Sequence, residues 1–117
     1  MKYINKNFYI EGVKASKLAN KFRTPLYCYS YKKLKENIYN FKNNFRSLNP
    51  IICFAVKANS NLTLLKEIGK FGLGADVVSI GELTQVLKAG IKPKKIVFSG
   101  VGKTSEELSF AIDKKIL

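Results

Sequence analysis

The residues best suited to chemistry lie where predicted strands end. The apolar run 51–56 leads directly into Lys57, and a lysine amine can form a Schiff base with a carbonyl compound. Asp76 lies at the end of the next predicted strand, and the segment Ser-Gly-Val-Gly-Lys at 99–103 follows a third. Functional groups of parallel βα folds gather at the carboxyl ends of the strands. The sequence therefore predicts an amine, a carboxylate and a glycine-containing loop on one rim, which is the edge of the sheet formed by the carboxyl ends of its strands.

Each of these features has a simpler interpretation as well. Lys57 is one of 21 basic residues and also fits a strand-end lysine that faces water. Desolvation would favour its neutral form and a neighbouring carboxylate its charged form, and the residues leave that balance open. Asp76 also fits a loop residue that binds backbone amides. The loop 99–103 lacks the spacing of known phosphate-binding motifs, and a tight βα turn before Thr104 explains both of its glycines.

A metal centre is not expected. The chain contains no histidine, and its two cysteines are far apart in the sequence. Cys28 and Cys53 each lie within an apolar stretch, where a free cysteine behaves as a small buried hydrophobic residue. A structural zinc site would therefore have no set of ligands.

The elements that must position these groups follow from apolar periodicity and helix-capping signals. A short strand at 8–10, a turn at 11–12 and an amphipathic segment over 13–22 are expected first. Strands are then expected at 26–29, at 51–56 (buried on both faces), at 75–78 and at 95–100. Helices are expected from Ser30 to Phe45, from Asn61 to about Gly72, from 79 through Ala89, and over 106–114. Two capping boxes are expected, at 79–82 and 104–107, and 116–117 resembles the start of another strand.

This alternation of buried strands and amphipathic helices predicts an α/β fold with parallel strands and right-handed crossovers. A parallel sheet needs both faces covered or a closed barrel, and three or four βα units cannot close an eight-stranded one. The sequence stops where a strand begins. We therefore expect an incomplete, truncated parallel (β/α) barrel.

Composition narrows the possible functions. In 117 residues, 46% are hydrophobic, which is enough for a core. No apolar run is long enough for a membrane span and the first residues lack a signal-peptide core, so a cytoplasmic protein is expected. The net charge of +13 raises the alternative of a small basic nucleic-acid-binding module, whose binding would weaken steeply with salt. The lysines are dispersed through every segment, which argues against such binding.

Three motifs carry a family resemblance: Phe-Ala-Val-Lys-Ala-Asn-Ser-Asn at 54–61, Gly-Ala-Asp-Val-Val-Ser-Ile-Gly-Glu-Leu at 74–83, and Ile-Val-Phe-Ser-Gly-Val-Gly-Lys at 96–103. With 8–13 and 24–27 ahead of them, the chain resembles the pyridoxal-phosphate-dependent decarboxylases with an alanine racemase-like barrel, above all the diaminopimelate decarboxylases. The resemblance implies the N-terminal portion of a TIM-like barrel. Residues 1–25 would lead into the barrel, and 26–117 would form its first βα units.

The resemblance also implies roles for individual residues. Lys57 would bind pyridoxal 5'-phosphate covalently as a Schiff base, Asp76 would lie near that lysine and the cofactor, and Glu82 would lie in the same neighbourhood. The complete enzyme would be a homodimer that converts a small amino acid, meso-2,6-diaminopimelate, to L-lysine. A decarboxylase of ornithine, arginine or carboxynorspermidine is the alternative within the fold. The remaining site residues would lie downstream of Leu117, so the piece alone is expected to be inactive.

Overall fold

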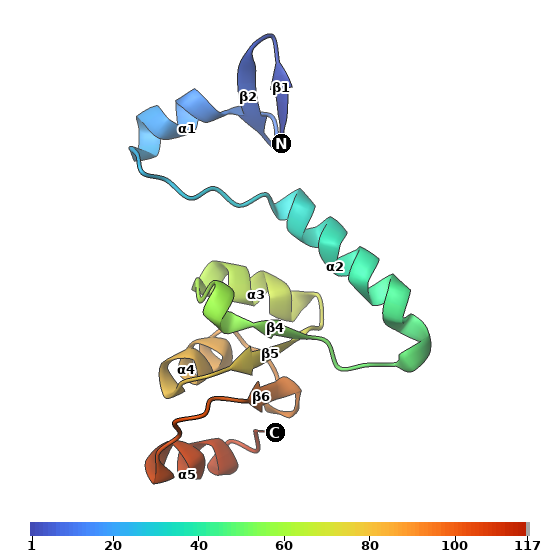
Figure 1. Cartoon of the computed structure of the whole chain (residues 1–117), viewed down its shortest axis with the longest axis vertical. Coiled ribbons are helices and arrows are strands. Elements are labelled where there is room, and N and C mark those ends of the chain that lie inside the picture. Colours follow the sequence, from blue (N-terminus) through green and yellow to red (C-terminus); the bar gives the residue numbers. More distant parts are fainter. Residues whose placement is uncertain (117) are drawn as a thin grey trace. The chain divides into compact units, whose positions relative to one another are not determined.

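The computed structural model describes residues 1–116, and contacts within it divide the chain into two compact units, Met1–Arg46 and Ser47 onward (Figure 1). The first unit contains a small antiparallel sheet and two helices. The second contains a parallel sheet and three helices. This second unit confirms the predicted α/β class.

The first unit begins with a three-stranded antiparallel meander. Its strands are β1 (Lys2–Ile4), β2 (Asn7–Ile10) and β3 (Val13–Lys14), paired in that order. Both connections are two-residue turns, at 5–6 and 11–12, in which every residue has positive φ (46° and 61°, then 49° and 85°). Such turns match the twist of paired strands. The central strand and the turn at 11–12 were predicted, whereas β1 and β3 were not.

Helices α1 (Ala15–Phe22) and α2 (Tyr31–Phe45) complete this unit. Ser30 caps α2 as predicted, because its hydroxyl accepts a hydrogen bond from the Lys33 amide at 3.0 Å. The strand expected at 26–29 is wrong, since these residues belong to no strand. A β-rich segment needs a partner for its backbone groups, and among residues 1–116 no strand pairs with this one.

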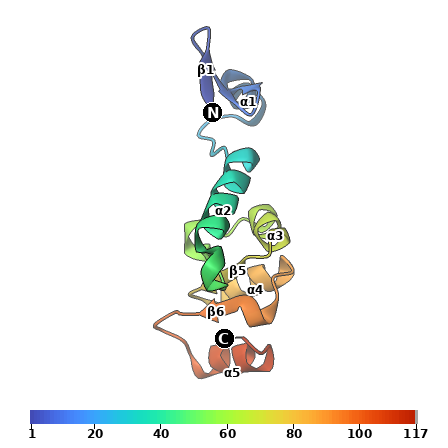
Figure 2. The same cartoon turned by 90° about the vertical axis from the view of Figure 1, so that its right-hand side faces the viewer.

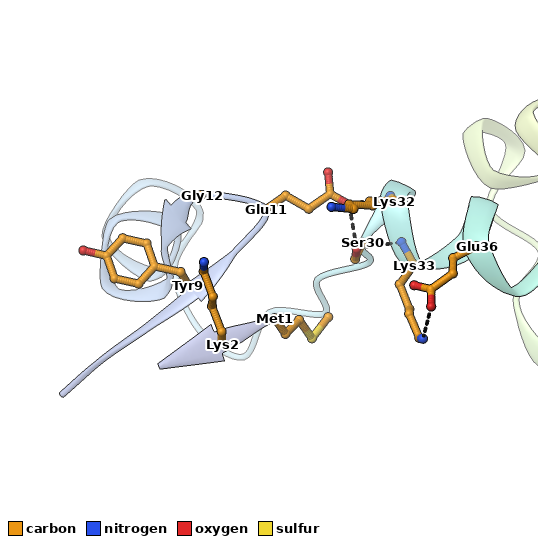
Figure 3. A pocket seen from close by; sticks show the side chains of 9 residues that line it. All are labelled: Met1, Lys2, Tyr9, Glu11, Gly12, Ser30, Lys32, Lys33 and Glu36. Carbon is orange, nitrogen blue, oxygen red and sulfur yellow. Dashed lines mark hydrogen bonds and ion pairs between the residues drawn. The ribbon is translucent and has the colours of Figure 1, made fainter. Parts of the chain in front are cut away.

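The Glu11 carboxylate links the meander to the start of α2 by hydrogen bonds. Glu11 lies in the second turn, and its Oε1 accepts hydrogen bonds from the Ser30 hydroxyl and the Lys32 amide, each at 2.5 Å. Figure 3 shows the Glu11 side chain reaching toward Ser30 at the edge of a cleft in this unit. The Ser30 hydrogen bond and then the Lys32 amide lower the pKa of Glu11 below its ordinary value.

The second unit is built on three parallel strands, β4 (Cys53–Ala55), β5 (Gly74–Val77) and β6 (Ile96–Phe98), in the order β4-β5-β6. Helices α3 (Leu62–Lys70) and α4 (Ile80–Lys88) connect them, and α5 (Ser105–Asp113) follows. Asn61 caps α3 as predicted, accepting from the amides of Thr63 and Leu64.

The core of this unit lies between the sheet and its helices, and α3 and α4 lie together beside the sheet (Figure 2). Ala75 and Val77 of β5 are fully buried against apolar residues of the helices, as is Ile96 of β6. Successive side chains of a strand point to opposite faces. Asp76, between the two buried residues of β5, therefore projects from the other face.

The run 51–56 is a shorter and less buried strand than predicted. Only Cys53–Ala55 is strand, Ile51 is 58% exposed, and residues 52–55 are half-buried. The physical reason is that β4 pairs only with β5, so its other edge has no partner strand among the described residues. Val56 is the fully buried residue of this run.

The two predicted capping boxes differ in detail. The Thr104–Glu107 box is confirmed in both directions. In the other, Ser79 accepts from the Glu82 amide at 3.3 Å, but Glu82 reaches past Ser79 to accept from the Val78 amide at 2.8 Å. The carboxylate thus satisfies the amide of the residue before the N-cap instead of that of the N-cap itself.

Near the C-terminal end, Ile116 belongs to no helix or strand, and Leu117 lies outside the described residues, so the strand expected there stays a prediction. Over residues 1–116, none of the helices has the length and apolar character that crossing a bilayer requires.

We predict that Glu11→Gln loosens the start of α2 in a pH-dependent way. The pKa of Glu11 is depressed in the folded state, so its contribution to stability is present above the ordinary carboxyl pKa and is lost as the pH falls through the depressed value. Hydrogen exchange of the Lys32 amide, corrected for its intrinsic rate, should lose protection at neutral pH in the variant. Glu36→Gln removes an exposed carboxylate of α2 as the control and should leave that amide protected. Equal protection in Glu11→Gln and the parent would contradict the prediction.

We also predict that Gly74→Ala destabilises the parallel sheet. A Cβ at Gly74 would collide with the backbone carbonyl of Lys95 and lie 2.9 Å from the Cys53 sulfur. Overpacking of this kind costs about 1–3 kcal/mol. Gly102→Ala is the matched control, because a Cβ there meets nothing within 4 Å. Urea unfolding of the two variants should differ accordingly, and equal midpoints would count against the close approach.

Candidate functional site

Lys57 lies immediately beyond the carboxyl end of β4. Residues Val56–Ala58 form a 3-10 helix, so the strand ends one residue before Val56 and the lysine stands on a tight turn. Its side chain is exposed, and the structure gives its ammonium no hydrogen bond or ion pair with the rest of residues 1–116. The side chain is therefore accessible and unpaired, and it can attack a carbonyl carbon once its ammonium has lost a proton.

Asp76 lies on the neighbouring strand. The register pairs it with Ala55 of β4 on one side and with Val97 of β6 on the other. Its carboxylate is half-buried on the sheet face away from the helices, and Oδ1 accepts a hydrogen bond from the Ser99 hydroxyl at 2.5 Å. The strands of Lys57 and Asp76 are neighbours as predicted, but the structure forms no ion pair between these two side chains.

The loop after β6 is folded tightly onto the end of β5. Ser99 continues the ladder through its amide, which donates to the Val77 carbonyl at 3.0 Å. A Cβ at Gly100 would collide with the Val78 carbonyl, so the close approach of the two chains requires a glycine there. Gly102 has no such contact. The interpretation as a tight turn is thus supported at one of the two glycines.

The Lys103 side chain binds backbone groups of its own loop. Its ammonium donates to the carbonyls of Phe98 (3.2 Å) and Gly100, and it lies 5.1 Å from the centroid of the Phe98 ring. Two of the three N–H donors of Lys103 are thus directed at backbone carbonyls of its own loop and not at a possible anion.

Two glutamates organise the helix starts behind this rim. Glu82 is half-buried and holds the Val78 amide, as described above. Glu107 accepts from the Thr104 amide at 2.9 Å with one oxygen and from the Ile80 amide at 3.2 Å with the other. It thereby joins the N-termini of α4 and α5. Both carboxylates have structural partners, which agrees with the interpretation of Glu82 as a capping residue.

Cys53 shares the sheet face of Asp76. It pairs in register with Gly74, and its thiol donates weakly to the Lys95 carbonyl at 3.7 Å. Burial, and next the negative charge of Asp76, raise the pKa of the Cys53 thiol above its ordinary value, while Lys95 acts in the opposite direction. The thiol is therefore protonated at neutral pH. Cys28 and Cys53 are both free and half-buried, less enclosed than predicted.

The rim thus consists of an unpaired amine, a carboxylate held by a hydroxyl, and a loop closed by its own lysine. Sequence reasoning placed the Ser99 loop on this rim but missed the hydrogen bond between Ser99 and Asp76. The alternation from Val97 to Ser99, on a strand parallel to that of Asp76, is the signal that could have indicated it. Within the described part of the chain, no group of three or more histidine, cysteine, aspartate or glutamate side chains could hold a metal ion.

Comparisons with known proteins agree with this geometry. The family model for the pyridoxal-binding domain of pyridoxal-dependent decarboxylases matches residues 31–117. A diaminopimelate decarboxylase from Aquifex aeolicus is 47% identical over 117 residues, all of this chain and 27% of that protein. The crystal structure of diaminopimelate decarboxylase from Helicobacter pylori complexed with L-lysine matches with a TM-score of 0.83 and 46% identity, over 88% of this chain and 26% of that one.

An ornithine decarboxylase structure from Entamoeba histolytica is more distant, with a TM-score of 0.63 and 31% identity over 73% of this chain and 24% of that one. The chain spans about a quarter of the length of the curated relatives it matches. Its fold is that of the N-terminal part of these α/β enzymes, as predicted.

We predict that Asp76→Asn makes Cys53 more reactive. Removing the negative charge lowers the pKa of the thiol, so more thiolate is present at a given pH. Alkylation of Cys53 by iodoacetamide at pH 8, followed by peptide mass spectrometry, should accelerate by roughly twofold. Asp113→Asn removes an exposed aspartate at the end of α5 as the control and should have no effect. An unchanged rate in Asp76→Asn would show that the carboxylate and the thiol are not electrostatically coupled.

Proposed function

The chain belongs to the pyridoxal-dependent decarboxylases, and from this membership we propose that the protein decarboxylates meso-2,6-diaminopimelate to L-lysine with pyridoxal 5'-phosphate as cofactor. The observation that carries the proposal is the position of Lys57. It presents an accessible, unpaired amine at the carboxyl end of a parallel strand, beside the strand of a half-buried carboxylate.

The groups on the rim fit the cofactor. An aldehyde needs an amine that it can reach, and Lys57 is exposed and engaged by no other side chain among residues 1–116. A polar cofactor ring needs a partner that is fixed in place, and Asp76 is held by Ser99 on the sheet face away from the helices. Lys103 is directed into its own loop, so we propose that the phosphate is bound by parts of the protein outside this chain.

In the proposed reaction, the bond between the α-carbon and its carboxylate breaks, carbon dioxide leaves, and a proton takes its place. Pyridoxal phosphate supplies the electron sink that makes this bond cleavage possible. The role of Lys57 is to hold the cofactor covalently and to exchange it with the amine of the substrate, which an exposed side chain on a short turn can do. The role of Asp76 is to bind and orient the cofactor through its carboxylate.

Diaminopimelate is favoured over other basic amino acids because the relatives that carry its name are more similar to this chain than the ornithine decarboxylase is. The Helicobacter pylori enzyme was crystallised with L-lysine, which is the product expected from diaminopimelate. An amino acid with two amine-bearing ends is thus the proposed substrate class.

The proposal extends to the organisation of the complete protein. Residues 1–25 would lead into the barrel and 26–117 would form its first βα units. A homodimeric assembly belongs to the same proposal and, like these domain bounds, rests on the sequence resemblance. A cytoplasmic location is also proposed, from the composition of the chain.

We predict that Lys57→Ala abolishes both covalent cofactor binding and catalysis. In the complete protein carrying this sequence, borohydride reduction in the presence of pyridoxal phosphate should attach a pyridoxyl group to Lys57, as detected by peptide mass spectrometry. The alanine variant should lack that adduct and lose decarboxylation of diaminopimelate by several orders of magnitude. Lys88→Ala, at an exposed lysine that ends α4, serves as the control.

Two outcomes would count against the proposed function. An adduct at another lysine would overturn the role of Lys57. Release of carbon dioxide from ornithine or arginine in preference to diaminopimelate would retain the chemistry but reject the proposed substrate.

A further inference from the structure

The Ser99 hydroxyl and the Asp76 carboxylate come together from neighbouring strands. Asp76 is opposite Val97 in the parallel register, and Ser99 follows two residues later on the same face of the sheet. The hydroxyl donates to Oδ1 of Asp76 at 2.5 Å, across 23 positions of sequence. A hydrogen bond to an ionised carboxylate is stronger than one between neutral groups.

Ser99 is exposed, but its backbone is fixed. Its amide donates to the Val77 carbonyl at 3.0 Å, which extends the β5–β6 ladder past the end of β6. The next residue, Gly100, touches the Val78 carbonyl so closely that a side chain could not be accommodated. The Lys103 ammonium then fastens the Gly100 carbonyl from the other side. The hydroxyl is therefore presented from a rigid turn.

Asp76 depends on this partner for its orientation. The terminal torsion of an aspartate has a broad, two-fold energy profile, so the backbone alone does not define where its oxygens lie. Among residues 1–116, Ser99 is the hydrogen-bond donor to this carboxylate. Holding Oδ1 leaves Oδ2 free and limits its possible directions.

We propose that Ser99 is a positioning residue for the cofactor site: its hydroxyl holds Oδ1 of Asp76, so that Oδ2 is available in a defined direction to the bound pyridoxal phosphate. The inference rests on the proposed function, in which Asp76 binds that cofactor. Ser99 itself makes no contact with the cofactor in this scheme. Its entire effect passes through the carboxylate.

A double-mutant cycle on the affinity for pyridoxal phosphate tests this role. In the complete protein, Ser99→Ala should raise the Kd about tenfold, the loss expected when a hydrogen bond to a charged group is removed. Ser99→Thr retains the hydroxyl and should stay within about twofold of the parent. In an Asp76→Ala background, Ser99→Ala should have no further effect, because the group that it positions is gone. Ser109→Ala, at an exposed serine of α5, is the control.

The outcomes separate this inference from the proposed function. If no pyridoxal phosphate attaches to Lys57 in the parent protein, the proposed function fails, and the role of Ser99 falls with it. If the parent binds cofactor at Lys57 but Ser99→Ala binds it equally well, the inference alone is overturned. A loss of affinity that threonine does not restore, or that persists in the Asp76→Ala background, also overturns it, because it indicates a structural role. Thermal unfolding shows whether each variant is folded. Where Ser99→Ala is not folded, Ser99→Cys provides the test, because it replaces the hydroxyl with a thiol of similar size that is a weaker donor, and it should also raise the Kd.

Discussion

The parallel pairing of β5 with β4 on one side and β6 on the other is the constraint on which the second unit depends. It sets the register in which Asp76 lies between Ala55 and Val97. Ala75 and Val77 are fully buried against the helices, so the strand has no freedom to turn over without removing both from the core. Burial of Ala75 and Val77 therefore places Asp76, the only charged residue of β5, on the opposite face. The position of Asp76 follows from its apolar neighbours in the strand.

The polar groups around the rim divide into those that build it and those that remain available. Ser79, Glu82, Thr104 and Glu107 satisfy backbone amides at the starts of α4 and α5, and Lys103 satisfies carbonyls at the end of β6. These contacts hold the turns that follow β5 and β6 in one conformation. Lys57 differs from them, because its turn is formed by backbone bonds and its amine is engaged by none of the described residues. An accessible amine at the end of a strand, beside turns held by hydrogen bonds, is an arrangement suited to covalent cofactor binding.

Capping residues and apolar spacing predicted the helices well, because the interactions that start a helix lie within a few residues of one another. Ser30, Asn61 and Thr104 cap their helices through bonds to amides two or three positions away, so spacing alone was sufficient to identify them. Strand predictions were less reliable, because a strand exists only with a partner. Among residues 1–116, residues 26–29 have the composition of a strand but no pairing. The run 51–56 is less buried than its apolar character indicated, because β4 has a single neighbour in this part of the chain. The strands β1 and β3 have little strand-like sequence pattern of their own. They form because the two-residue turns at 5–6 and 11–12 bring them beside β2.

The sequence by itself determined the candidate chemistry: which lysine is proposed to supply the amine, that Asp76 follows it one βα unit later, and which family the motifs resemble. These properties reside in residue types and short spacings, which the chain carries whether folded or not. Only the tertiary structure decided the partners of these groups. The bond between Ser99 and Asp76 spans 23 positions and exists because the β5–β6 register brings the two side chains to one face. Lys103 turned inward because the loop after β6 approaches β5 closely at Gly100, a contact that depends on strand packing and not on local sequence.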